Sequence, residues 1–127
     1  MAAWLAGYER AWRAPGTDLL AELFTDGATY QADPYDEPIR GLPAIAAFWE
    51  REREGPDEVF TMDAELLAVD GEQAVARVHV RYGDPAVREY RDLWLIRFAP
   101  DGRCGAFEEW PFFPGQPRVA PGVPGAS

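Results

Sequence analysis

The sequence predicts one α+β domain in which N-terminal helices pack on one side of a curved antiparallel sheet. Apolar residues in the first half recur at helical spacing, whereas those in the second half alternate with more polar residues. Asp-Gly turn signals separate the alternating runs, as is typical of an antiparallel meander. A chain of 127 residues is long enough for one such domain, with a core and one modest cavity.

Three helices are predicted in the first half. Trp4, Tyr8 and Trp12 share one helical face, and the helix that carries them ends before Pro15. A second, short helix has its apolar stripe over residues 19–24, and we expect a turn at Asp26-Gly27 to end it. A third helix follows Gly41, with Pro43 in its first turn, where a proline is tolerated.

Strands are predicted for most of the remaining chain. A short strand over residues 28–31 precedes a proline-containing loop, and the second half then alternates over about 60–66, 74–82, 87–98 and 103–113. The Pro- and Gly-rich stretch from Pro114 onward cannot support regular structure. We therefore predict a folded domain over residues 1–113 and a disordered tail over residues 114–127.

The composition excludes several classes of function. Twenty-two acidic residues against twelve basic ones give a formal net charge of −10, so we expect no binding to nucleic acid or to anionic membranes. One serine, one histidine and no lysine exclude a Ser–His–Asp triad and a lysine Schiff base. One cysteine and one histidine are too few for a structural zinc site, so we expect no metal and no cofactor. The single cysteine and the lack of a long apolar run predict a cytoplasmic protein.

Carboxylates interrupt two of the predicted strands. Asp92 lies on an otherwise apolar face between Tyr90 and Trp94, where burial would raise its pKa and mark a functional site. The alternative is that Asp92 pairs with an arginine, such as Arg77, Arg91 or Arg97, or caps a backbone group near a bulge. In the last strand either Glu108 or Glu109 must point inward; we favour Glu109, although a solvated pair at a sheet edge fits equally well. His79 is expected to be exposed or at a subunit contact.

Over about residues 4–113, short motifs follow one another in a characteristic order: Leu23-Phe24-Thr25-Asp26-Gly27, Asp33-Pro34, Glu37-Pro38-Ile39-Arg40-Gly41, Tyr90-Arg91-Asp92-Leu93-Trp94 and Ile96-Arg97-Phe98. These motifs carry a resemblance to the nuclear transport factor 2-like superfamily, in particular to its SnoaL-like and ketosteroid-isomerase-like members. It implies a cone-shaped sheet around an internal pocket (a cystatin-like α+β barrel), often dimeric through the outer sheet face. We accordingly expect a homodimer.

The resemblance also implies roles for individual residues. Asp33 matches the general base of ketosteroid isomerase, and Tyr8 matches its oxyanion tyrosine. Trp94 stands at the position of the second oxyanion acid, with Asp92 two residues earlier on the same face, so the implied catalytic residues are Asp33, Tyr8 and Asp92. The implied pocket is lined by Trp94, Trp49, Phe24, Tyr30, Glu109 and Phe107, with Phe24 and Trp49 replacing tyrosines of the isomerase.

Two functions are consistent with these residues. The first is a cofactor-free isomerase, cyclase or dehydratase that transfers protons between carboxylates, a tyrosine and an apolar substrate beside its carbonyl group. The second is a non-catalytic ligand-binding or dimerisation module with the same fold. In both, the expected ligand is an apolar small molecule.

Overall fold

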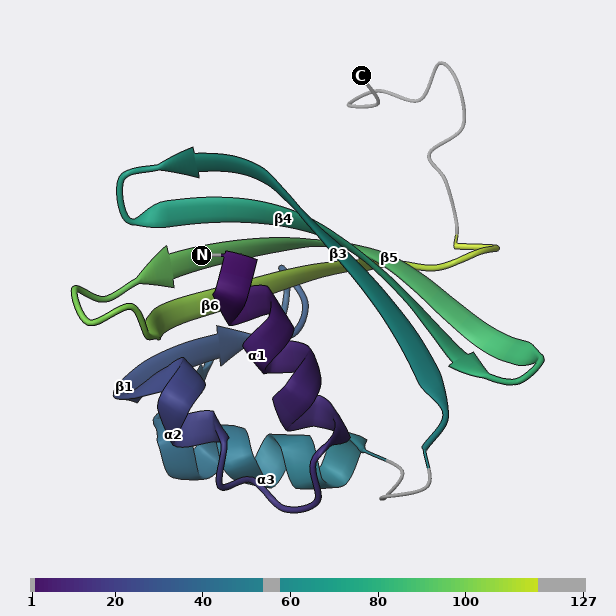
Figure 1. Ribbon diagram of the computed structural model, residues 1–127, viewed down its shortest axis with the longest axis horizontal. Helices are drawn as coiled ribbons and strands as arrows, with labels where there is room; N and C mark the ends of the chain where they lie inside the picture. Colours follow the sequence, from purple (N-terminus) through teal and green to yellow (C-terminus); the bar gives the residue numbers. More distant parts are fainter. Residues whose placement is uncertain (1, 54–57, 117–127) are drawn as a thin grey trace.

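The computed structural model describes residues 2–53 and 58–116, and Figure 1 shows a curved sheet wrapped over one side of the helices. The described helices are α1 (Ala2–Arg13), α2 (Leu20–Leu23) and α3 (Leu42–Glu52). The described strands are β1 (Phe24–Gln31), β2 (Ile39–Arg40), β3 (Phe60–Asp70), β4 (Gln73–Gly83), β5 (Ala86–Phe98) and β6 (Cys104–Phe112). The predicted α+β class is confirmed. Most of the predicted tail, residues 117–127, lies outside the described residues.

The described strands form one sheet in the order β2-β1-β6-β5-β4-β3. Strands β3 to β6 pair antiparallel with their chain neighbours, which confirms the predicted meander. Strand β1 pairs in parallel with β6, so the sheet is mixed, and the prediction of a wholly antiparallel sheet was wrong at this pair. A parallel pair needs a long connection, and α3 together with β3–β5 supplies it. Strands β2 and β3 stand at opposite edges, so the curved sheet is open and not a closed barrel.

Strand β1 begins earlier than predicted. It starts at Phe24, directly after α2, and contains Asp26-Gly27, which therefore does not form the expected turn. The pairing of β1 with β6 is irregular between Phe24 and Thr29. A bulge absorbs residues that a regular ladder cannot pair, which explains how a turn-like dipeptide is accommodated inside a strand.

The core lies between the helices and the concave face of the sheet and is rich in aromatic rings. Trp4 and Tyr8 from α1, Trp49 from α3 and Phe24 from β1 are buried there, as is Phe107 from β6. Helix α1 contributes one apolar stripe, and β4 and the second half of β5 contribute every second side chain, as the periodicities predict. Among the described residues, no helix is long and apolar enough to cross a lipid bilayer.

Candidate active site

A cavity of about 370 Å³ lies between the concave face of the sheet and helices α1 and α3. Its walls are mainly aromatic and come from both layers: Tyr8, Trp12, Tyr30, Phe48, Phe60, Tyr82, Tyr90 and Trp94. The volume suits a small organic ligand. A larger hollow of about 540 Å³ lies next to α2 and two hairpin turns, but its charged lining residues, Arg10, Glu22 and Glu72, are all exposed. Buried ionisable groups meet only in the aromatic cavity, within the part of the chain that the structure describes.

Two carboxyl groups, those of Asp92 and Glu109, meet inside this cavity. Trp94 on β5 stands directly opposite Glu109 on β6, and Asp92 stands opposite Pro111, so Asp92 and Glu109 are diagonal neighbours on the concave face. Their side chains are hydrogen-bonded to each other. The indole Nε1 of Trp94 donates to Oε2 of Glu109 over 3.0 Å. Asp92 is only 4% exposed, and neither carboxyl forms a salt bridge among the described residues.

Burial shifts the pKa of both carboxyls upward. Loss of solvation raises the pKa of Glu109 well above its usual value, and the hydrogen bond and the negative charge of Asp92 raise it further. Loss of solvation also raises the pKa of Asp92, but the hydrogen bonds from Glu109, from Trp94 and from the backbone of Phe112 oppose the shift. Glu109 therefore holds the proton of the pair, and Asp92 carries the negative charge. One acid and one base thus stand side by side.

Two tyrosine hydroxyls form a second polar group in the wall of the cavity. The hydroxyls of Tyr8 and Tyr30 are 2.7 Å apart and hydrogen-bonded, and both residues are buried. Burial raises the pKa of each phenol well above its usual value. The Tyr8 ring packs against Trp94 with a centroid distance of 4.4 Å. These phenols therefore stay protonated and can act as hydrogen-bond donors.

Five of the sequence-predicted residues meet at the cavity: Tyr8, Tyr30, Asp92, Trp94 and Glu109. Asp92 faces the cavity and has no arginine partner among the described residues. Of the two neighbouring glutamates, Glu109 lines the cavity and Glu108 does not.

Four other predicted residues do not line the cavity. Phe24, Trp49 and Phe107 are fully or nearly fully buried behind its wall, as core residues. Asp33 lies in the loop after β1, where its Oδ1 accepts the backbone N–H of Tyr35 over 3.0 Å, as expected for an aspartate that caps a turn. Its role as general base stays a prediction.

Sequence reasoning missed part of the cavity. Tyr82 and Tyr90 line it from inward positions of β4 and β5, which the alternation could have identified. The charged residues Asp36, Glu52, Glu58 and Arg88 also line it, and they carried no periodic signal. The described residues contain no group of three or more His, Cys, Asp or Glu side chains that could hold a metal ion.

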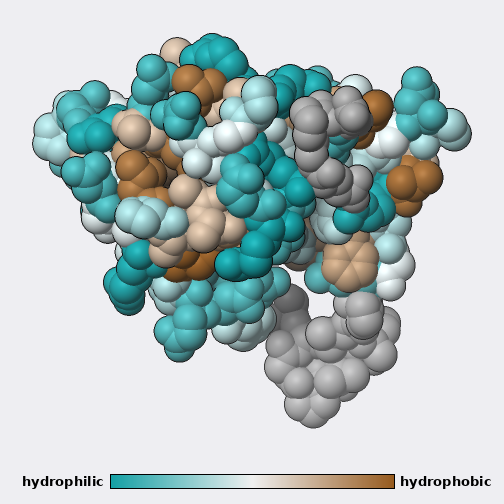
Figure 2. Space-filling view, turned by 90° about the horizontal axis from the view of Figure 1, so that it is seen from below, coloured by the Kyte–Doolittle hydropathy of each residue, from teal (hydrophilic) through white to brown (hydrophobic). Residues whose placement is uncertain are grey.

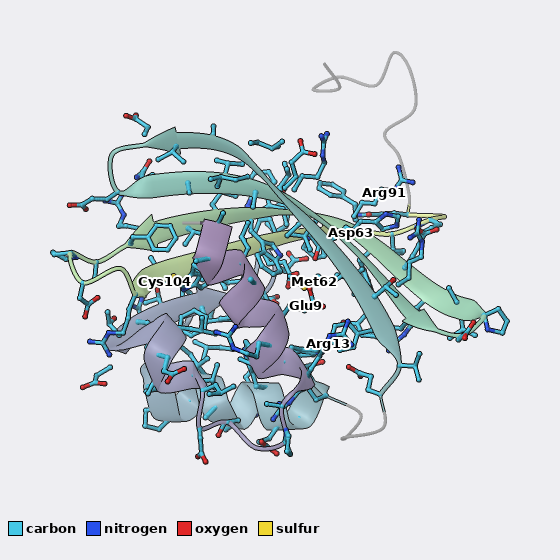
Figure 3. All side chains as sticks on the ribbon, in the orientation of Figure 1. Glu9, Arg13, Met62, Asp63, Arg91 and Cys104 are labelled. Atoms are coloured by element: carbon cyan, nitrogen blue, oxygen red, sulfur yellow. The ribbon has the colours of Figure 1, made fainter. Side chains whose placement is uncertain are left out.

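A pair of titratable side chains, His79 and Glu89, lies on the opposite, convex face of the sheet. Nε2 of His79 is 2.7 Å from Oε2 of Glu89, and the side chain of His79 is 21% exposed. Its cross-strand neighbours are Asp63 and Arg91. Figure 3 shows Asp63 and Arg91 toward this face, whereas Met62, next to Asp63 in the chain, lies near α1. His79 is thus separated from the cavity by the sheet.

Similarity to solved structures supports the fold. SalBIII, an epoxide hydrolase/cyclase-like enzyme of pyran ring formation in the polyether salinomycin, superposes with a TM-score of 0.71 at 15% identity, over 87% of this chain and 89% of that one. A protein from Parabacteroides distasonis assigned as a ketosteroid isomerase gives 0.60 at 17% identity, over 87% and 86%. One from Jannaschia sp. CCS1 assigned as a SnoaL-like polyketide cyclase gives 0.61 at 19% identity, over 83% and 75%. At these identities the likeness concerns the fold alone.

The sequence itself settles the family. A search of curated proteins gives no significant match. The family model of the SnoaL-like domain, however, matches residues 5–105, which include most of α1, all of α2 and α3, and the strands β1–β5 with the start of β6. This chain therefore belongs to the SnoaL-like domain family.

Proposed function

We propose that this protein is an enzyme of the isomerase or cyclase type, which transfers protons beside the carbonyl group of an apolar small molecule. The observation that carries the proposal is the Asp92–Glu109 pair inside an aromatic cavity. Two adjacent carboxyls whose surroundings drive their pKa values apart provide a general acid and a general base at the same pH. Fold neighbours assigned as a ketosteroid isomerase and as a polyketide cyclase support the same reaction class.

The proposed steps use side chains alone. The Asp92 carboxylate removes a proton from the carbon next to the substrate carbonyl, while Glu109 gives its proton to the carbonyl oxygen, so that an enol forms. Tyr8 provides a second hydrogen-bond donor for that oxygen when Tyr30 is the donor within the Tyr8–Tyr30 pair, because the hydroxyl hydrogen of Tyr8 is then free. Return of the proton from Asp92 to a different carbon, and of the enol proton to Glu109, completes an isomerisation. In a cyclisation, the enol carbon instead attacks a second carbonyl carbon of the substrate and opens its C=O double bond; the enol O–H proton returns to Glu109, and protonated Asp92 gives its proton to the new alkoxide oxygen.

The test is turnover of a panel of β,γ-unsaturated ketones and polyketide-like β-dicarbonyl compounds. Asp92→Asn and Glu109→Gln should each lower kcat/KM by about 100-fold or more, the usual scale of general acid–base catalysis. Asp63→Asn, which removes a carboxylate from the other face of the sheet, should leave kcat/KM unchanged.

An Asp33→Asn variant decides between the two candidate bases. If Asp33→Asn loses activity and Asp92→Asn does not, the general base is Asp33, in the loop after β1, and not Asp92. If the wild-type protein turns over no member of the panel and still binds its members, the non-catalytic ligand-binding module is the better description.

A further inference from the structure

The indole of Trp94 holds one particular oxygen of Glu109. The two residues are direct cross-strand partners on β5 and β6, and Nε1 of Trp94 donates to Oε2 of Glu109 over 3.0 Å. No second N–H group donates to Glu109 among the described residues. A neutral carboxyl group accepts a hydrogen bond better at its carbonyl oxygen than at its hydroxyl oxygen. The indole therefore makes Oε2 the carbonyl oxygen of neutral Glu109 and leaves the proton on Oε1.

The packing of Trp94 gives this N–H a fixed direction. Trp94 is 2% exposed, and its ring lies 4.4 Å from the ring of Tyr8 and 5.1 Å from the ring of Phe107, measured between centroids. A large ring enclosed in this way cannot turn without displacing its neighbours, since protein interiors are close-packed. The oxygen that receives the hydrogen bond is held in the same way, and with it the orientation of the whole carboxyl group.

The other face of β6 carries a pair of the same chemical kind. Nε1 of Trp110 donates to Oε2 of Glu108. Trp110 is 38% exposed, however, and Glu108 does not line the cavity. Water can compete for both groups of this outer pair, whereas the inner pair is enclosed by aromatic rings. The strand thus contains its own control for the effect of an indole donor on a glutamate.

We infer that Trp94 is a positioning residue for the acid of the proposed reaction: its N–H fixes Oε2 of Glu109 as the carbonyl oxygen, so that the proton given to the substrate sits on Oε1. This inference rests on the proposed function, because it concerns the acid of the same reaction. Trp94 acts through Glu109 and does not itself donate to the substrate. The resemblance placed Trp94 at the position of an oxyanion acid, but here its donor is already engaged by a neighbouring side chain.

Loss of the N–H should make Glu109 bind its proton more tightly. Burial raises the pKa of Glu109 and of Asp92, and the hydrogen bond from Trp94 opposes that rise, because it stabilises the ionised carboxyl. The other titratable or charged groups that line the cavity near the pair are three phenols, which burial keeps protonated, and one guanidinium: Tyr8, Tyr30, Tyr82 and Arg88. Removal of the N–H should therefore raise the proton affinity of Glu109 about tenfold, the scale of one hydrogen bond to a charged group.

Nuclear magnetic resonance of the full chain tests the link between the two side chains without any substrate. The chain has five tryptophans, so the Trp94→Phe variant assigns the indole N–H signal of Trp94, and Glu109→Gln assigns the carboxyl carbon of Glu109. As the pH is raised, both signals should move with one common midpoint, whereas the indole signal of Trp110 should not follow that midpoint. A Trp94 indole signal that ignores the ionisation of Glu109 would overturn the inference.

An isosteric replacement separates the hydrogen bond from the packing. Substitution of 3-benzothienylalanine for Trp94 keeps the bicyclic ring and its contacts with Tyr8 and Phe107, but puts sulfur in place of the N–H. It should lower kcat/KM about tenfold and move both the Glu109 titration and the pH profile of kcat/KM to higher pH. The same substitution at Trp110 removes the donor of the outer pair and should move neither.

The two readouts distinguish the failure of this inference from the failure of the proposed function. Turnover that depends on Asp92 and Glu109, with a pH profile and a Glu109 titration unchanged by the replacement at Trp94, would refute this inference alone. A Glu109 titration that shifts as expected, in a protein that turns over no member of the panel, would refute only the proposed function.

Discussion

The buried carboxyl of Glu109 should make the stability of this protein fall as the pH rises. In the folded state, loss of solvation and Asp92 raise its pKa well above the usual value, whereas in the unfolded chain the pKa is about 4.3. Between these two values the folded protein binds one proton more than the unfolded chain does. The free energy of unfolding then falls by at most about 1.4 kcal/mol per pH unit. The stabilisation is complete below pH 4.3 or so and is lost as the pH rises through the raised, folded-state pKa.

Glu109→Gln removes this titration and keeps the shape of the side chain. Its amide oxygen can still accept the hydrogen bond from Trp94, so the cavity wall should remain in place. Between pH 5 and pH 7, the wild-type protein should lose up to about 2.7 kcal/mol relative to the variant. This interval also avoids the acid range in which Asp101 and Glu89, whose pKa values are lowered by Arg103 and His79, take up protons.

Urea unfolding followed by tryptophan fluorescence, at pH 5, 6 and 7 and constant ionic strength, measures the difference. Groups that do not contact Glu109 cancel in the comparison, whereas Asp92, its hydrogen-bond partner, does not. Glu108→Gln is the matched control, because Glu108 is the neighbouring residue of β6 but does not line the cavity. Parallel stability curves for the wild type and Glu109→Gln would show that Glu109 is ionised in the folded state, and would refute both the acid role of Glu109 and its burial as a protonated group.

Two further predictions concern packing and assembly. Arg53 is 9% exposed at its side chain and donates to the carbonyl oxygens of Ala14 (2.7 Å) and Gly16 (2.6 Å), which ties α3 to the end of α1. Arg53→Met should therefore cost about 1–3 kcal/mol in urea unfolding, whereas Arg97→Met, at an exposed site, should cost less than about 0.5 kcal/mol. For the homodimer that we propose through the convex face of the sheet, Trp110→Glu should give a monomer by light scattering, since Trp110 is 38% exposed there. A wild-type protein that is already monomeric would refute this proposal.

The side of the molecule that carries α3 is mainly hydrophilic. Viewed from below, Figure 2 shows small brown groups of residues on this face among more numerous hydrophilic ones.

Local sequence patterns could predict much of this fold, because they report which face of an element is buried. The alternation in β4 and β5 identified the inward residues and made Asp92 stand out as a carboxylate among them. Two-residue strand β2 was missed because two residues cannot show an alternation. Asp33 was selected by its resemblance to a family motif. In the structure, the carboxylate of Asp33 accepts a hydrogen bond from the backbone N–H of Tyr35, and an aspartate in an Asp-Pro turn forms such a bond without any catalytic role.

The arrangement of the site depends on a contact that no local pattern encodes. Tyr30 reaches Tyr8 because β1 lies parallel to β6, which sets Tyr30 beside Phe107 with their rings 4.6 Å apart. Alternation predicts that Tyr30 points inward, but it does not specify which strand lies next to β1 or in which direction. The same β6 carries Glu109 two residues after Phe107, so a single strand places the tyrosine pair and the carboxyl pair on one cavity. With β1 paired only to β2, Tyr8 would keep its place in α1 and lose its hydroxyl partner. The parallel pair is therefore the part of the fold on which the proposed chemistry depends most.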